Sequence, residues 1–347
     1  MLPANVLLSK DPVHDLRIFL DKKKYSAIAV LVDENVLQHC YPLLERALTP
    51  YPVIKVKSGE EQKTLNTCVT IWQHMTDQAL DRHAALIVIG GGVLGDMGGF
   101  CAATYKRGID FILVATTLLA QTDASIGGKL AVDFNSFKNH IGVFQLPALS
   151  LLYSGFFKTL PEPELRSGFA EVIKHALISD KRMWDEIRTK SLQEQEWDKL
   201  VLHSVTFKSY VVTEDPKEKG LRKILNAGHT IGHAIESYLL ATHNRVLHGE
   251  AVAAGLIAEN HIALKKGYLD SESFEQIARY LIRIFGKIML TQASLSDIAA
   301  LTLQDKKNKG NKILCVLLDG IGKAKLNCEI SIEEVMEALS FYVNLQI

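Results

Sequence analysis

The sequence lacks the features that mark secreted, membrane-spanning and nucleic-acid-binding proteins. Its five cysteines are scattered, without a C-x-x-C pair, which fits a reduced, cytoplasmic protein. Lysine plus arginine equals aspartate plus glutamate at 39 each, so no excess charge favours nucleic acid. No uncharged apolar run reaches membrane-spanning length, and the first residues lack the basic and apolar parts of a signal peptide. We therefore expect a cytoplasmic protein without a nucleic-acid or membrane partner.

A glycine-rich stretch follows one of the buried strands that the sequence predicts. Gly90, Gly92 and Gly95 spell G-x-G-x-x-G between a strand pattern and a small-residue helix, the context that this motif requires. Such glycines let the backbone approach a pyrophosphate at a helix N-terminus, although they also serve plain tight packing. The next strand, F-I-L-V-A-T-T, does not end in the usual acid. Asp33, after a strand over residues 26–32, either holds the ribose instead or simply caps the next helix.

The predicted secondary structure changes near Lys158, where alternating strand and helix patterns give way to a long run of helical patterns. The 347 residues, 48% of them hydrophobic, are enough for two ordinary domains. We expect an α/β, Rossmann-like nucleotide-binding domain at residues 1–155. Residues 156–347 are expected to form a mainly α-helical domain.

The second informative stretch is N-A-G-H-T-I-G-H-A-I-E, followed by L-H-G-E. His229 and His233 are four residues apart, so they project from one face of a helix, and His248 follows after a polar spacer. Three histidines with an upstream acid fit a metal that keeps an open coordination position. The same spacing also occurs on solvated helix faces. Upstream, Glu171 and Lys174 lie three apart in an apolar helical run, where the alternative to a site is an exposed ion pair.

Several polar residues stand beside glycines in otherwise apolar sequence. They are Arg107, Asp123, Lys129 and the pair Lys138-Asn139. Lysines near glycine turns suit a phosphate or carboxylate, as compact point charges with rotatable donors. Each one alone is compatible with an ordinary surface charge, but together they indicate an anionic small molecule.

Taken together, these blocks resemble the 3-dehydroquinate synthase family, of the sugar phosphate cyclase superfamily. The resemblance covers about Asp33 to Gly255 and rests on these blocks, in order: G-G-G-V-L-G-D, T-T-L-L-A-Q-T-D-A-S-I-G-G-K, K-N-H-I-G, A-E-V-I-K, G-L-R-x-x-L-N-x-G-H-T-x-G-H-A-I-E and L-H-G-E-A-V. The chain departs from the family at G-G-K-L-A-V-D, where G-G-K-T-G-V-N is more usual, and the extreme N-terminus matches poorly.

The resemblance implies NAD and Zn²⁺ (or Co²⁺) as cofactors, with the site in a cleft between the two domains. Glu171, His229 and His248 would be the zinc ligands, so the two helical histidines would not both bind metal. His233 would transfer protons on the phosphate side of the substrate, and Lys174 and Glu218 would be the other catalytic residues.

The binding residues that the resemblance implies fall into two sets. Those facing NAD would be Asp33, Asn35, Glu60, Lys63, Gly91, Gly92, Val93, Asp96, Thr116, Thr117 and Lys138. Those holding the substrate would be Arg107, Asp123, Lys129, Asn139, Lys208, Arg222, Asn226 and Lys307, the last being one of three lysines in D-K-K-N-K that fit its position.

The implied reaction converts 3-deoxy-D-arabino-heptulosonate 7-phosphate to 3-dehydroquinate and phosphate, within the shikimate pathway to the aromatic amino acids. It would proceed by transient oxidation with NAD, phosphate elimination, re-reduction and intramolecular aldol closure. Family members are commonly homodimers. The alternatives are another sugar phosphate cyclase, which makes an inosose or valiolone ring, and a metal-dependent polyol dehydrogenase, which would accumulate NADH. A non-catalytic module would bind NAD without zinc.

Overall fold

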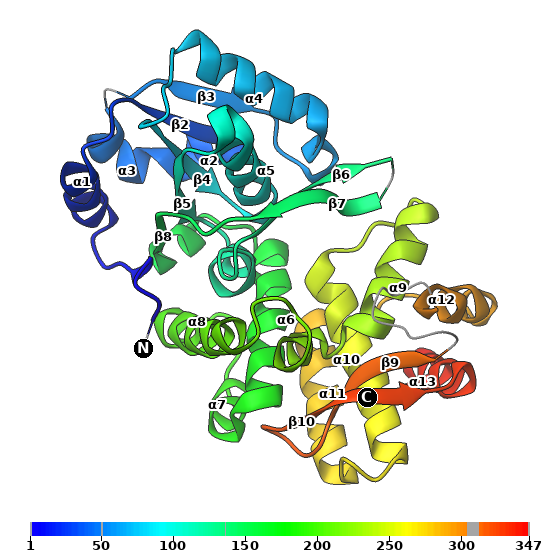
Figure 1. Ribbon diagram of the computed structural model, residues 1–347. Coiled ribbons are helices and arrows are strands. Elements are labelled where there is room, and N and C mark those ends of the chain that lie inside the picture. The colour runs from blue at the N-terminus through cyan, green and yellow to red at the C-terminus, as the bar shows by residue number, and fades with distance from the viewer. Residues whose placement is uncertain (1, 50, 136, 304–311, 346–347) are drawn as a thin grey trace. The chain divides into compact units, whose positions relative to one another are not determined.

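The computed structural model describes residues 2–49, 51–135, 137–303 and 312–345 (Figure 1). The chain forms two compact units, one from the chain up to Pro161 with Trp197–Ser209 and the other from Glu162–Glu196 and the chain from Tyr210 onward. Compactness does not show which parts fold independently, so the domain boundary expected near residue 155 remains a prediction. No helix in the described ranges has the length and apolar character needed to cross a membrane.

A six-stranded parallel sheet forms the centre of the first unit. In spatial order its strands are β1 (Val6–Leu8), β8 (Leu149–Leu152), β5 (Asp110–Ala115), β4 (Ala85–Gly90), β2 (Ile28–Asp33) and β3 (Val53–Val56). β4 is buried along its whole length, as a central parallel strand covered on both faces must be. From β2 the chain runs outward to β3, whereas β4, β5 and β8 extend the sheet the other way. The topology therefore switches between β2 and β4.

Helices cover both faces of this sheet (Figure 1). They are α1 (Pro12–Lys23), α2 (Glu34–His39) and α3 (Tyr41–Leu48) on one face, and α4 (Leu65–Asp77) and α5 (Gly92–Thr104) on the other. Because successive strand residues point to opposite faces, Val30 and Ile87 pack in the first core while Leu31 and Val88 pack in the second. The predicted α/β Rossmann-like class is confirmed.

Shorter elements complete the first unit. They are η1 (Glu60–Gln62), η2 (Tyr105–Arg107), the π-helical η3 (Ala120–Ala124), the antiparallel hairpin β6 (Lys129–Phe134) and β7 (Phe137–Phe144), and η4 (Ser154–Lys158). The unit also includes α8 (Trp197–Glu214) as far as Ser209.

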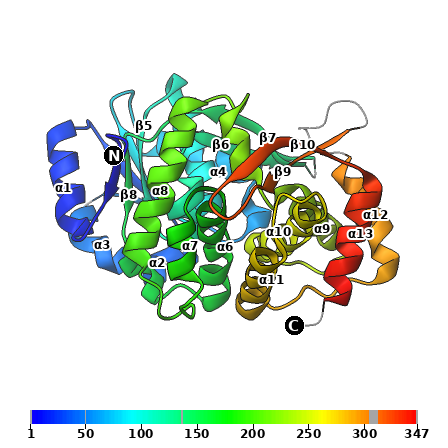
Figure 2. The ribbon, with the colours of Figure 1, turned by 90° about the horizontal axis from the view of Figure 1, so that it is seen from below.

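The second unit is mainly helical, as expected from the sequence. Its helices are α6 (Glu162–Ser179), α7 (Lys181–Ile187), η5 (Leu221–Asn226), α9 (His229–Ala241), α10 (His248–Lys265), α11 (Ser271–Phe285), η6 (Gln292–Ser294), α12 (Leu295–Thr302) and α13 (Ile332–Asn344). Strands β9 (Ile313–Leu318) and β10 (Ala324–Ile330) pair antiparallel. α10 is buried along most of its length because α6, α9, α11 and α13 all pack against it (Figure 2).

Candidate active site

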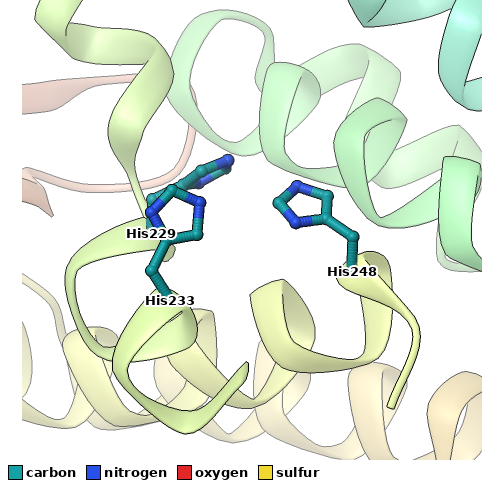
Figure 3. Close-up of side chains that lie close together, drawn as sticks. All are labelled: His229, His233 and His248. Carbon is teal, nitrogen blue, oxygen red and sulfur yellow. The ribbon is translucent and has the colours of Figure 1, made fainter. Parts of the chain in front are cut away.

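Two of the three histidines that the motif singles out stand at the first position of a helix. His229 begins α9 and His248 begins α10. Gly228, immediately before His229, has φ +77°, and a Cβ there would lie 2.6 Å from Leu256 Cγ, so the turn into α9 needs glycine. His229 and His233 project together from α9 toward His248 (Figure 3). The ring centroid of His229 lies 4.9 Å from that of His233 and 5.4 Å from that of His248, and the centroids of His233 and His248 are 5.7 Å apart. The helical face predicted from their spacing therefore exists.

The Glu171 carboxylate of α6 lies against two of these rings. Its Oε1 is buried and makes no hydrogen bond, while the Nε2 atoms of His229 and His248 lie 3.5 and 3.6 Å from it. Ligands about 2.1 Å from a tetrahedral zinc stand about 3.4 Å from one another. One carboxylate oxygen and two imidazole nitrogens thus have the spacing and chemistry of metal ligands.

Hydrogen bonds set the tautomers of both imidazoles. His229 Nδ1 lies 3.0 Å from the carbonyl oxygen of Ala227, and His248 Nδ1 lies 3.2 Å from Oε2 of Glu236. A carbonyl or carboxylate oxygen can only accept, so each Nδ1 donates, and Nε2 is the nitrogen that presents a lone pair when the ring is neutral. Sequence reasoning missed Glu236. It follows His229 by seven residues on the same helix, but its partner His248 belongs to another helix, so no local pattern indicated the contact.

Electrostatics in this cluster balance around the Glu171 carboxylate. Burial opposes its charge, but Lys174 and the two histidines hold its pKa well below the usual range, and Lys174 Nζ pairs with Oε2. Burial, with the charge of Lys174, lowers the pKa of His229 well below normal and keeps that ring neutral. Burial acts the same way on His248, but the carboxylates of Glu171 and Glu236 outweigh it and raise its pKa to about 10, so this ring must give up a proton before it can bind a metal. His233, in contrast, is exposed.

Backbone contacts hold the helices of this cluster close together. Gly249, next to His248, donates its N–H to Ser167 Oγ over 2.9 Å, and a Cβ on Gly249 would clash with the Ser167 carbonyl. Ser167 precedes Glu171 by one turn of α6. The contact therefore sets the position of the His248 end of α10 relative to the Glu171 carboxylate.

Several of the residues expected at NAD lie at one edge of the first unit. The carboxyl ends of parallel strands share an edge, and Asp33, Glu60, Gly91 and Thr116 end or follow β2, β3, β4 and β5 respectively. The topology switch between β2 and β4 lies at this edge, where doubly wound sheets bind ligands. Val93 and Gly92 form the first turn of α5, Thr117 follows Thr116, and Asn35 is exposed on α2.

Asp33 caps a helix at this edge. Its Oδ1 accepts a hydrogen bond of 2.8 Å from the Val36 N–H at the start of α2. Burial raises the pKa of this carboxyl, although the backbone donors oppose that shift. Helix capping, one of the two interpretations open from the sequence, is thus observed, and the ribose role stays a prediction.

Two of the glycines after β4 differ in what surrounds them: one is needed for close packing, whereas a Cβ on the other would find room. A Cβ on Gly98 would lie 2.6 Å from Val88 and 2.8 Å from Leu31, so that glycine allows α5 to pack on the sheet. A Cβ on Gly92 would meet only Ala124, at the ordinary distance of 3.4 Å. The backbone at the start of α5 is therefore open, as an approaching phosphate requires.

Lys63 joins residues from both expected binding sets. It is 5% exposed, and its Nζ donates to Asp96 Oδ2 and to Asn139 Oδ1, each over 2.6 Å. Burial raises the pKa of Asp96 even though Lys63 opposes the shift. Lys138 forms a looser ion pair with Glu60, 3.9 Å apart.

Lys208 in α8 bonds to Asp123. Its Nζ donates to the backbone oxygen and to Oδ1 of that residue, each over 2.6 Å, and the lysine is 6% exposed. The other two expected substrate residues of this unit, Arg107 at the end of η2 and Lys129 at the start of β6, are exposed.

The segment before α9, which includes η5, carries Glu218, Arg222 and Asn226. Asn226 Nδ2 donates to Glu218 Oε1 over 2.8 Å, and the buried Arg222 donates to the Pro216 carbonyl over 2.8 Å. The Asp215 carboxylate shapes this loop by accepting three backbone N–H groups, from Lys219, Gly220 and Arg222. Lys307 lies outside the described residues.

Comparison with known proteins shows which family the chain belongs to. The model of the 3-dehydroquinate synthase N-terminal domain matches residues 53–167, and that of the C-terminal domain matches residues 168–308. A 3-dehydroquinate synthase from Parabacteroides distasonis is 35% identical over 99% of this chain and 98% of its own length. One from Sulfurovum sp. is 39% identical over 98% of each chain. The chain belongs to the 3-dehydroquinate synthase family.

Solved structures similar to this member of the 3-dehydroquinate synthase family include other cyclases. A 2-deoxy-scyllo-inosose synthase, in complex with carbaglucose-6-phosphate, NAD⁺ and Co²⁺, is 25% identical with a TM-score of 0.84 over 96% of this chain and 95% of its own. A 2-epi-5-epi-valiolone synthase from Streptomyces hygroscopicus, with NAD⁺ and Zn²⁺ bound, shares the fold at 24% identity and a TM-score of 0.86, covering 99% of this chain and 97% of its own. Butanol dehydrogenase A from Thermotoga maritima also shares it, at 13% identity and a TM-score of 0.69 over 99% and 98% of the two chains.

Proposed function

We propose that this chain is a 3-dehydroquinate synthase that converts 3-deoxy-D-arabino-heptulosonate 7-phosphate to 3-dehydroquinate and phosphate. Family membership supports the reaction. The observation that carries the site is the unbonded Oε1 of Glu171, with the Nε2 atoms of His229 and His248 at 3.5 and 3.6 Å. A buried oxygen in that position needs a cation to replace its lost hydration.

Glu171, His229 and His248 would hold Zn²⁺ or Co²⁺, and NAD would lie at the carboxyl edge of the sheet near Asp33 and Gly92. Bound there, the metal would polarise a substrate hydroxyl and the nicotinamide would accept and return a hydride. The residues fit both groups, because the three metal donors converge and the start of α5 is open to a pyrophosphate.

Protons would be moved by His233, Lys174 and Glu218. His233 is the exposed member of the three histidines, which suits proton exchange with a substrate better than ligation. Lys174 has its Nζ on Glu171 Oε2, so it neutralises the ligand carboxylate and keeps a charged donor buried at the site. Glu218, hydrogen-bonded to Asn226, is a third proton-transfer group.

The anionic ends and hydroxyls of the substrate would be held by cations and polar side chains that other residues keep in place. In the first unit these are Lys208, bonded to Asp123, and the amide Asn139, bonded to Lys63, with Arg107 and Lys129 as exposed cations. Arg222, Asn226 and the late lysine Lys307 complete the expected set. Holding two anionic ends at once makes positioning a large part of the rate enhancement.

The same proposal includes a partner, an oligomeric state and a compartment. The small-molecule partner would be a sugar phosphate, two copies of the chain would form a homodimer, and the enzyme would work in the cytoplasm. All five cysteines are free, which fits a reducing compartment.

The deciding experiment follows phosphate release and NADH absorbance together while the purified chain is incubated with heptulosonate phosphate, NAD⁺ and Zn²⁺. The proposed reaction is redox-neutral overall, so phosphate should appear without net NADH, and 3-dehydroquinate should be the product. Glucose 6-phosphate serves as the second substrate because the similar inosose synthase was solved with a carbocyclic glucose phosphate. Turnover of that sugar alone would make the chain a different cyclase, and net NADH would make it a dehydrogenase.

A further inference from the structure

Helix α9 starts at a proposed metal ligand, yet its own sequence leaves that start uncapped. The residue before His229 is Gly228, which has no side chain to accept the free N–H groups of the first turn. The first helical hydrogen bond of α9 runs from Gly232 N to the Gly228 carbonyl, over 3.1 Å. At the start of α10, in contrast, a carboxylate of the same helix takes part, because Glu250 accepts from the Leu247 N–H over 2.9 Å.

A carboxylate from α10 supplies the missing cap of α9. Glu259 accepts from the Gly228 N–H through Oε2 over 2.6 Å and from the Ile231 N–H through Oε1 over 3.0 Å. Glu259 is 1% exposed and lies 31 and 28 residues away from these donors in the sequence. A carboxylate is costly to bury, and two backbone donors at a helix N-terminus offset that cost.

The helices meet at this point backbone to backbone. A Cβ on Gly255 would clash with the Gly228 carbonyl oxygen and would lie 2.6 Å from the Gly232 nitrogen. A Cβ on Gly232 would lie 2.9 Å from the Ala251 carbonyl oxygen. Side chains are thus excluded where α9 and α10 contact each other. Glu259, one turn beyond Gly255, is the polar side chain that holds the two helices together at this contact.

We propose that Glu259 is a positioning residue of the metal centre, an inference that rests on the proposed metal site. By holding the Gly228 N–H, Glu259 fixes the peptide that joins Gly228 to Ala227. The Ala227 carbonyl, 3.0 Å from His229 Nδ1, in turn fixes the tautomer and rotation of the ring, so that Nε2 faces Glu171. α10 therefore positions one ligand directly, as His248, and the other through Glu259.

The test compares Glu259→Gln with the unaltered chain in a Co²⁺ titration of metal-free protein. The amide turns an N–H group toward one of the two backbone donors, so the α9 start shifts. We expect the Kd for Co²⁺ to rise about 10- to 100-fold, the usual range for residues that orient a ligand, with altered Co²⁺ visible absorption bands. Unfolding temperature is measured on the same samples.

Two variants separate positioning from plain stability. Asp270→Asn makes the same chemical change at the cap of α11, where Asp270 accepts from the Ser273 N–H over 2.8 Å. Leu281→Ala destabilises the same unit from a fully buried position in α11. Both should lower the unfolding temperature and leave the Co²⁺ Kd and spectrum unchanged.

A folded Glu259→Gln variant with unaltered Kd and spectrum would overturn the inference and leave Glu259 a structural cap. If that variant does not fold, Glu259→Asp, which keeps the charge but shortens its reach, takes the same titration, and unaltered binding there overturns the inference too. Failure of the unaltered chain to bind Co²⁺ would instead remove the proposed metal site itself.

Discussion

Glu236 of α9 and His248 of α10 are joined by a contact of 3.2 Å between Oε2 and Nδ1. The carboxylate orients the imidazole by its outer nitrogen and leaves Nε2 facing the Glu171 carboxylate, 3.6 Å away. Carboxylate–histidine pairs of this kind raise the basicity of a metal ligand and fix its tautomer. The relationship crosses between two helices, so the site depends on their packing.

Glu171→Ala should abolish metal binding and turnover while leaving NAD binding detectable. The change removes the only carboxylate of the proposed ligand set, whereas the edge of the sheet near Asp33 belongs to the first unit. Metal content after dialysis and an NAD titration by fluorescence measure the two properties separately. Full activity in this variant would refute the assignment.

Glu236→Gln should weaken Co²⁺ binding about tenfold without affecting NAD binding. The amide is a poorer acceptor for His248 Nδ1, so the ring is held less firmly and is less basic. Glu275→Gln, an exposed change in α11 at an ion pair with Arg279, is the matched control and should behave as the unaltered chain. Equal Co²⁺ affinity in the Glu236 and Glu275 variants would show that the hydrogen bond between Glu236 and His248 does not contribute to metal binding.

Gly92→Ala and Gly98→Ala should affect different properties. The Gly92 Cβ finds room, so stability should be kept, but it would stand where a pyrophosphate approaches, and NAD affinity should fall at least tenfold. The Gly98 Cβ would press on Val88 and Leu31 and should cost about 1–3 kcal/mol of unfolding free energy. Urea unfolding and NAD titration of both variants form the test. Unchanged NAD affinity in Gly92→Ala would place the pyrophosphate elsewhere.

Lys63→Met should destabilise the first unit by about 3 kcal/mol, because it leaves the Asp96 carboxylate largely buried without its cation. Affinity for NAD should fall as well. Adding Asp96→Asn should recover part of the stability, since the unpaired charge is gone, but it should not recover NAD binding. Urea unfolding of the single and double variants measures the coupling, and a double variant no more stable than the single would contradict it.

His261 of α10 should make stability depend on pH. Its ring stacks on Phe341 with centroids 4.1 Å apart, and burial, followed by the charge of Lys265, lowers its pKa from 6.5. Since the unfolded chain then binds the proton more readily, this stability is complete above about pH 6.5 and is lost as the pH falls through the folded pKa.

Replacing His261 with phenylalanine keeps the stack and removes the titration. The loss of unfolding free energy between about pH 8 and pH 5.5 should therefore be smaller in His261→Phe than in the unaltered chain. Urea unfolding at both pH values provides the comparison. An identical loss in both proteins would assign the pH dependence to other groups.

Much of the fold was predictable because its signals are local. A buried strand, glycines and a small-residue helix follow one another around Gly90, and β4 and α5 form there as predicted. The spacing of His229 and His233 likewise predicts one helical face. The interpretation of Asp33 stayed divided because a helix cap and a ribose ligand call for the same residue type at the same strand end.

The amino-acid sequence by itself determined the α/β and helical parts, the family, and the residue types of the site, because periodicity and motif spacing are properties of neighbouring residues. Tertiary packing decided which atoms meet. Glu171 Oε1 faces two imidazoles only because α6, α9 and α10 pack together, and Glu236 and Glu259 act on helices other than their own. A carboxylate in a helix has the same local pattern whether it faces solvent or another helix's backbone, so these roles are invisible until the helices are packed.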